Sequence, residues 1–222
     1  ILDLGCGTGY FPRELGKRYP NAKVTGADLA QGMVEYCRAQ SQQEEYLCAD
    51  ALVLPFESDS FDFVFSNLTF QWIDELPQLF QELNRVLKPE GSFALAVWAD
   101  AKSMPTMLWA YEVLKDKIPE DIHPPLKKIT SMGEQGAIEL LLENAGFTNT
   151  QVRRKTFHYE FNSFSNYWDI IEASDIMKLQ FDALDESQRL SVRGEVAVFA
   201  QQYSDSNGFH VPHDYLLVTG SK

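Results

Sequence analysis

The stretch Ile1-Leu2-Asp3-Leu4-Gly5-Cys6-Gly7-Thr8-Gly9 decides the fold of this chain. A short apolar run carries an acid, three glycines follow at alternate positions, and a helix-like stretch begins at Tyr10. This order predicts a strand, a tight loop and a helix. Because glycine has no Cβ, such a loop can adopt positive φ angles and bring its backbone against a ligand. The N-terminus of the following helix attracts anionic groups, so we expect a nucleotide-type ligand here.

The spacing of the glycines narrows the class of ligand. A dinucleotide fingerprint reads G-x-G-x-x-G, whereas here Gly5, Gly7 and Gly9 alternate behind Asp3. The pattern Asp-x-Gly-x-Gly-x-Gly resembles motif I of the class I S-adenosylmethionine-dependent methyltransferases. A glycine-rich turn that merely connects a strand to a helix is the alternative, and the rest of the chain must decide between them.

Composition and charge bound the possible functions. With 222 residues, of which 45% are hydrophobic, the chain can bury a full core and is expected to form a single domain. Its 19 basic and 32 acidic residues give a formal net charge of −13. A charge of this sign repels phosphate backbones and anionic membrane surfaces, which argues against nucleic acid as the substrate.

The cysteine count and the hydropathy pattern predict where the protein resides. Cys6, Cys37 and Cys48 match neither a disulfide framework nor a zinc site, so we expect reduced thiols in a cytoplasm and no metal. No apolar stretch is long enough for a membrane span, and no charged-then-apolar leader is present. The chain opens without Met inside an expected strand, so we expect that native residues upstream are missing.

Two further expected strands end in acids. Residues 23–28 end at Asp28, about twenty residues beyond the glycine loop, where a carboxylate can accept hydrogen bonds from both ribose hydroxyls. The alternative, a cap for the helix that begins at Gln31, is also sound, and the two roles can coexist. Residues 45–51 end at Asp50 and Ala51; in the methyltransferase family these positions face adenine. In isolation, an Asp at a strand end is more often a turn residue.

The next elements complete an α/β pattern. Residues 61–67 form the fourth expected strand, residues 75–87 a helix with apolar residues at helical spacing, and residues 92–98 the fifth strand. Alternating strands and helices predict a parallel sheet with right-handed crossovers, in which ligands bind beyond the carboxyl ends of the strands. The glycine loop, Asp28, Asp50 and Asn67 can therefore converge on one ligand.

An ordered set of motifs in the first hundred residues strengthens the resemblance. Residues 61–67, Gln71-Trp72 and residues 85–91 resemble the methyltransferase group that includes the ubiquinone/menaquinone-biosynthesis C-methyltransferases and the malonyl-acyl-carrier-protein methyltransferases. This chain departs from the group at Glu90, where Gly is common, and in lacking an upstream helix.

The resemblance implies a fold and a set of cofactor contacts. The fold is a doubly wound, Rossmann-like sheet of seven strands, mostly parallel, in which the last strand, 215–219, lies antiparallel between the fifth strand and the strand 148–159. The cofactor that the resemblance implies is S-adenosylmethionine. Its expected contacts are Asp3, Gly5, Cys6, Gly7, Asp28, Leu29, Met33, Asp50, Ala51 and Asn67.

The second half of the chain is expected to supply the acceptor side. Residues 161–204 predict an inserted pair of helices that could form a substrate lid within the single domain 1–222. Trp72, Trp98, Tyr167 and Trp168 are candidate pocket walls, although aromatic residues at helical spacing are more often core. None of the four histidines has a neighbouring pattern that marks catalysis, and no catalytic residue is assigned.

The sequence therefore predicts an S-adenosylmethionine-dependent methyltransferase acting on oxygen or carbon of a small molecule, which an acyl carrier could present. Methyl transfer requires in-line placement of the acceptor, and proximity supplies much of the rate gain; a base is optional. A non-catalytic cofactor-binding subunit and, less favoured, a nicotinamide-dependent oxidoreductase remain alternatives. The acceptor and the oligomeric state are not revealed.

Overall fold

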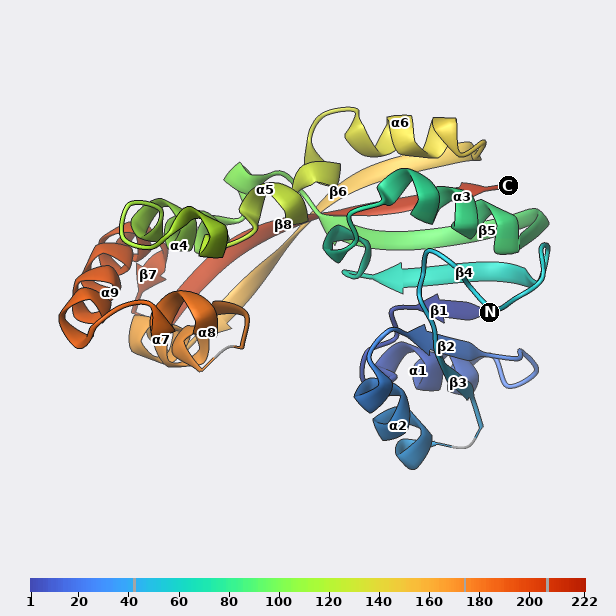
Figure 1. Cartoon of the computed structure of the whole chain (residues 1–222), viewed down its shortest axis with the longest axis horizontal. Helices are drawn as coiled ribbons and strands as arrows, with labels where there is room; N and C mark the ends of the chain where they lie inside the picture. Colours follow the sequence, from blue (N-terminus) through green and yellow to red (C-terminus); the bar gives the residue numbers. More distant parts are fainter. Residues whose placement is uncertain (42, 174, 207) are drawn as a thin grey trace. The chain divides into compact units, whose positions relative to one another are not determined.

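The computed structural model describes residues 1–41, 43–173, 175–206 and 208–222, and it contains a mixed sheet flanked by helices (Figure 1). The strands are β1 (Leu2–Leu4), β2 (Thr25–Asp28), β3 (Glu45–Cys48), β4 (Phe61–Asn67), β5 (Leu87–Trp98), β6 (Thr148–Phe161), β7 (Ser204–Asp205) and β8 (Gly208–Ser221). The helices are α1 (Tyr10–Arg18), α2 (Gln31–Gln40), α3 (Leu76–Val86), α4 (Pro105–Leu114), α5 (Leu126–Ile129), α6 (Ala137–Asn144), α7 (Phe164–Glu172), α8 (Asp175–Asp182) and α9 (Glu186–Ala200).

The sheet order confirms the expected fold class. The strands follow the order β3-β2-β1-β4-β5-β8-β6, and the two-residue β7 pairs with β8 as an eighth strand. Neighbours from β3 to β5 are parallel. Hydrogen bonds join Lys222 N to Gly91 O and Ala99 N to Asp214 O, so β8 runs antiparallel to β5. The last strand thus lies between β5 and β6, as the resemblance implies.

The chain divides into two compact units. Unit 1 comprises residues 1–98, 131–154 and 216–222, and unit 2 comprises residues 99–130 and 155–215. In unit 1 the strand order reverses between β1 and β4, which is the switch point at which open α/β sheets bind ligands. The loops after these two strands therefore define the place to look for a site.

Helix α3 shows how the sequence pattern builds unit 1. Its apolar residues at helical spacing, Leu79, Phe80, Leu83 and Val86, are all buried, as the periodicity predicts. The helix ends at Val86, but β5 begins at once at Leu87, five residues before the expected strand. Glu90, with φ +63°, lies within this early part of β5, where the pairing with β4 shifts register.

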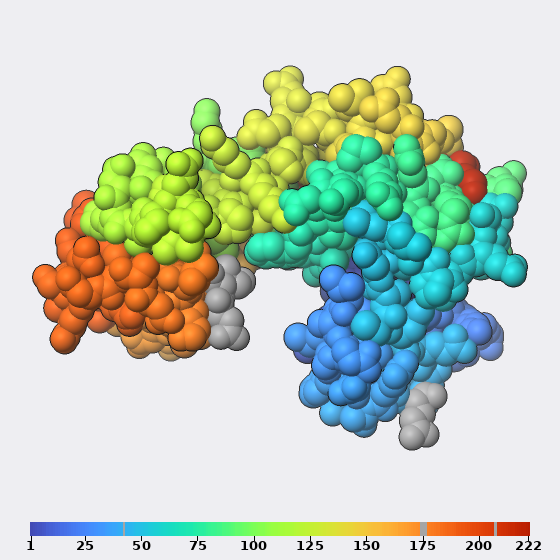
Figure 2. Space-filling view, viewed as in Figure 1, coloured from blue at the N-terminus to red at the C-terminus, as the bar shows by residue number. Residues whose placement is uncertain are grey.

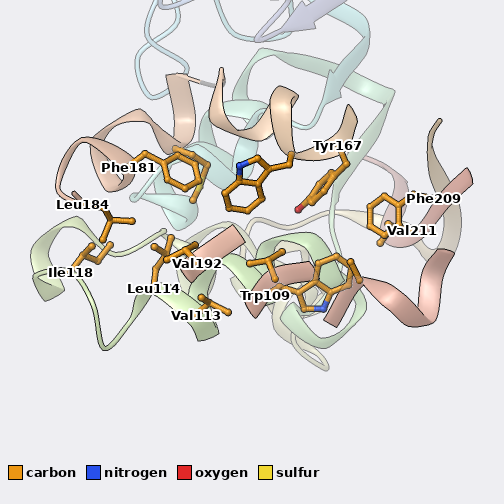
Figure 3. Packing of buried hydrophobic residues seen from close by; sticks show 14 residues of the cluster. Trp109, Val113, Leu114, Ile118, Tyr167, Phe181, Leu184, Val192, Phe209 and Val211 are labelled. Carbon is orange, nitrogen blue, oxygen red and sulfur yellow. The ribbon is translucent and has the colours of Figure 1, made fainter. Parts of the chain in front are cut away.

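Unit 2 has its own apolar core (Figure 3). Trp109 from α4, Tyr167 and Trp168 from α7, Phe181 from α8 and Phe209 from β8 lie among its buried members. In Figure 2 the yellow-green segment of α4 lies directly against the orange segment of α9. The described residues of the stretch 161–204 form three helices where two were expected, because Asp185 and Gln188 form a capping box that starts a separate α9.

Candidate functional site

The glycine loop after β1 adopts the conformation that its sequence predicts. The φ angles of Gly5, Gly7 and Gly9 are +80°, +52° and +75°, in a region that residues other than glycine rarely occupy. A Cβ on Gly5 would lie 2.2 Å from Cγ2 of Thr69, whereas a Cβ on Gly7 would meet no atom within 4 Å. The backbone at Gly7 therefore faces open space, where a ligand can approach it closely.

Asp28 at the end of β2 is tied to this loop. Its Oδ2 accepts a hydrogen bond from Gly7 N at 2.8 Å, and its Oδ1 accepts one from Ala30 N at 2.9 Å. The cap at the start of α2 is Ala30, which forms no side-chain cap, so Asp28 stabilises the turn before the helix without being its cap residue. Each carboxylate oxygen keeps a second lone pair for a further donor.

Asp3 is the buried acid of the site. Its side chain is 1% exposed, and Oδ2 has no hydrogen-bond partner among the described residues. Burial, and secondarily the negative charge of Asp28, raise the pKa of Asp3 to about 7. A buried carboxyl group without a partner is costly in free energy, so a ligand that donates a hydrogen bond to it would be favoured.

The ends of β2 and β3 present an apolar and acidic rim. Leu29 is 71% exposed and Met33 is 41% exposed. Asp50 is exposed and accepts a turn hydrogen bond from Leu52 N, and Ala51 follows it in the half-buried turn. Because Asp28 pairs with Cys48 across the two parallel strands, these residues follow strand ends at the same edge of the sheet.

The turn after β4 contacts the glycine loop directly. Asn67 ends the strand, and the Thr69 hydroxyl donates to Gly5 O at 3.2 Å. The hydroxyl of buried Ser66 donates to Leu4 O at 2.6 Å. Two hydroxyl groups thus fix the end of β4 against the end of β1. Sequence reasoning missed Thr69, whose partner lies 64 residues away in sequence.

Two thiols lie beneath the loop. Cys6 and Cys37 are buried and hydrogen-bonded to each other, and Cys37 Sγ donates to Gly7 O at 3.2 Å. Burial raises the pKa of both thiols, which disfavours the reactive thiolate. Their role in this structure is to support the loop; Cys6, expected to contact the cofactor, is 7% exposed.

The four aromatic candidates lie in different surroundings. Trp72 is 43% exposed beside the turn after β4, and Trp98 is buried at the end of β5. Tyr167 and Trp168 are buried within the core of unit 2. Their role as pocket walls stays a prediction, and only Trp72 presents a large exposed ring in the ligand-free protein.

Unit 2 contains a buried polar group that sequence reasoning missed. Thr106 Oγ1 and His213 Nε2 lie 2.8 Å apart, and Thr106 also hydrogen-bonds the Tyr167 side chain. Burial lowers the pKa of His213 to about 4, so the ring is neutral at physiological pH. The two partners are 107 residues apart, so no local pattern could have revealed them.

In the part of the chain that the structure describes, no cluster of three or more His, Cys, Asp or Glu side chains could hold a metal ion. None of the helices described is long and apolar enough to cross a membrane.

Comparisons with known proteins match the first half of the chain most strongly. A family model described as a methyltransferase domain matches residues 2–95. A malonyl-[acyl-carrier protein] O-methyltransferase of Halorhodospira halophila is 44% identical over 101 residues, covering 44% of this chain and 34% of that protein. This chain thus spans about a third of that relative's length. One of Geobacter sulfurreducens is 28% identical over 226 residues, covering 99% of this chain and 82% of that protein.

A solved structure extends the likeness to the fold. Phosphoethanolamine N-methyltransferase 2 of Haemonchus contortus, in complex with phosphomonomethylethanolamine and S-adenosylhomocysteine, matches with a TM-score of 0.61 and 21% identity. The match covers 100% of this chain and 48% of that one. Residues 2–95 thus form a methyltransferase domain, and the chain is similar to S-adenosylmethionine-dependent methyltransferases in its glycine loop, its acidic strand ends and its fold.

Proposed function

We propose that the protein transfers the methyl group of S-adenosylmethionine to the carboxylate of a small acyl group, such as malonyl, held on an acyl carrier. The observation that carries the cofactor assignment is the convergence of the open backbone at Gly7, the carboxylate of Asp28 and the unpartnered Oδ2 of Asp3. The acceptor assignment rests on relatives that are named malonyl-[acyl-carrier protein] O-methyltransferases.

The residues of unit 1 fit this cofactor group by group. Asp28 has free lone pairs for the ribose hydroxyls. The pKa of buried Asp3 is raised, and an ammonium group beside it would stabilise its carboxylate anion. Gly7 leaves room for close backbone approach. The exposed apolar side chains of Leu29 and Met33 can cover adenine, and Asp50 with Ala51 can hydrogen-bond its edge.

The protein's part in the reaction is to place the acceptor in line with the methyl group. When bound, S-adenosylmethionine supplies a methyl group on a sulfonium leaving group. A carboxylate acceptor is already a nucleophile, so the protein needs no base and must orient the acceptor in line and exclude water. Asn67 and Trp72, at the end of β4 and in the turn that follows it, are the residues of unit 1 proposed to face the acceptor. The roles of Trp98, Tyr167 and Trp168 as pocket walls and of residues 161–204 as a substrate lid remain part of this proposal.

The proposed setting is a cytoplasm, with an acyl carrier as partner and no role for nucleic acid. Cys6, Cys37 and Cys48 are all free thiols, which suits a reducing compartment. The net charge of −13 opposes binding to a phosphate backbone.

A methyl-transfer assay tests the acceptor. The protein is incubated with isotope-labelled S-adenosylmethionine and, separately, malonyl-acyl-carrier protein, malonyl-coenzyme A and a quinone precursor, and products are identified by mass spectrometry. We expect methyl ester on the carrier-linked malonyl group, formed more slowly by the Asp28→Ala variant at a sub-saturating cofactor concentration. Methylation of the quinone precursor alone would show that the acceptor assignment is wrong while leaving the cofactor assignment intact.

A further inference from the structure

The turn after β4 contains a strained residue. Leu68 has φ +53°, while the other described non-glycine residues with positive φ are Asp59, Glu90 and Asn149, all polar and exposed. Such a backbone is strained in a bulky residue and persists only where the surroundings hold it. This turn is therefore maintained by specific contacts, and it lies at the switch point of the sheet.

Gln71 is one of the residues that hold the strained turn. Leu68 N donates to Ala96 O at 2.8 Å, and Gln71 Nε2 donates to Leu68 O at 2.8 Å. Thr69 adds its hydrogen bond to Gly5. The side-chain amide of Gln71 thus connects to the glycine loop through a single short turn.

The other end of the same amide lacks a partner. Gln71 is 2% exposed, and its Oε1 is buried with no hydrogen-bond partner among the described residues. Exchanging the amide oxygen and nitrogen would place two acceptor oxygens against each other at Leu68 O, so the hydrogen bond fixes the orientation. Oε1 can therefore accept only from an N–H or O–H donor, and a carboxylate or phosphate group of a ligand is excluded as its partner.

A second buried acceptor lies on β1, the strand beside β4. Asp3 on β1 has an unpartnered Oδ2, and β1 pairs directly with β4. Two unsatisfied oxygens, one on β1 and one in the short 3-10 helix Phe70–Trp72 that follows β4, suit a group with several donors, and an ammonium group has three. Resting on the proposed function, we infer that Gln71 Oε1 accepts a hydrogen bond from the α-ammonium group of the cofactor, and so makes the site specific for the amino-acid end of that ligand.

A series of ligands separates this role from a structural one. The dissociation constants of S-adenosylhomocysteine and of its analogue without the α-amino group are measured by calorimetry for the wild type, Gln71→Met and Gln81→Met. Gln81 is an exposed glutamine of α3 and serves as the matched control. We expect Gln71→Met to weaken S-adenosylhomocysteine on the order of 10- to 100-fold, which is the value of a hydrogen bond to a charged group. Affinity for the deaminated analogue should fall less, because that ligand loses only what the Nε2 hydrogen bond to Leu68 O contributes through the turn.

Each other outcome overturns the inference. Equal losses for both ligands mean that Gln71 acts only through the shape of the turn, and no loss for either means that it makes no contact. Failure of the wild type to bind S-adenosylhomocysteine overturns the proposed function together with this inference, whereas wild-type binding with an unchanged variant overturns the inference alone.

A measurement on the wild type covers the case in which Gln71→Met does not fold. In an NMR titration, the side-chain amide signal of Gln71 should shift on addition of S-adenosylhomocysteine and not on addition of the deaminated analogue. The same shift with both ligands would contradict the assignment.

Discussion

Asp28 is the residue on which the cofactor site depends most. Its carboxylate already holds Gly7 N and Ala30 N, and it is assigned to the ribose hydroxyls. We predict that Asp28→Ala weakens S-adenosylhomocysteine on the order of 10- to 100-fold, because charge-assisted hydrogen bonds are lost. Asp62→Ala, an exposed acid of β4 paired with Lys88, is the control in the same unit. An unchanged dissociation constant in folded Asp28→Ala protein would show that the assignment is wrong.

The raised pKa of Asp3 should make the stability of the ligand-free protein depend on pH. Its folded pKa of about 7 lies above its ordinary value of 3.8. Between these values the folded state binds more protons than the unfolded state, so the free energy of unfolding falls as pH rises through this window. Above it the full penalty applies, on the order of 4 kcal/mol.

The comparison with Asp3→Asn isolates this effect from the other acids. In urea unfolding, the variant should gain stability relative to the wild type as pH rises from about 4 to about 8, the span of the raised pKa. Parallel stability curves for the two proteins over this range would contradict the account of Asp3 as a buried, unpartnered carboxyl group.

At the scale of the element, the glycine loop and helix α2 give opposite predictions for the same substitution. Gly5→Ala places a Cβ 2.2 Å from Thr69 at a φ of +80°, so the free energy of unfolding should fall by more than about 1 kcal/mol. Gly32→Ala, in α2 with no atom within 4 Å of the added Cβ, should be neutral or stabilising by up to about 1 kcal/mol. Chemical denaturation measures both, and equal effects would count against the loop geometry.

The elements differ in how far the sequence could predict them. The parallel strands and the acids at their ends were predictable, because strand period and strand-end position are local properties. The break between α8 and α9 was also encoded locally, in Asp185 and Gln188 of the capping box, and was missed. The positive φ of Leu68 was not predictable, because it depends on Ala96 and on the side chain of Gln71.

The candidate site divides in the same way. Gly7 and Asp28, which meet in the structure, could be paired from a glycine loop and an acid about twenty residues apart. The lack of a partner for Asp3 Oδ2 and the buried pair of Thr106 and His213 could not be predicted. Each depends on residues from distant parts of the chain that fold around it. The cofactor contacts and the acceptor-pocket residues stay predictions.

At the scale of the whole molecule, we expect a substitution in the core of unit 2 to change stability without changing cofactor binding. Trp168 is 2% exposed in the core of unit 2, while the proposed cofactor residues belong to unit 1. We predict that Trp168→Ala lowers the free energy of unfolding by about 3–5 kcal/mol. The dissociation constant of S-adenosylhomocysteine for the folded fraction should not change. A large loss of affinity in folded protein would show that Trp168 contributes to the cofactor site.

Calorimetric titration of the protein with S-adenosylmethionine, S-adenosylhomocysteine and NAD tests the central claim most directly, since it asks which ligand the glycine loop and the acids of unit 1 select. The account predicts saturable binding of the first two and none of NAD, because the spacing of Gly5, Gly7 and Gly9 differs from the dinucleotide fingerprint. Binding of NAD in their place, or of none of the three, would contradict the account.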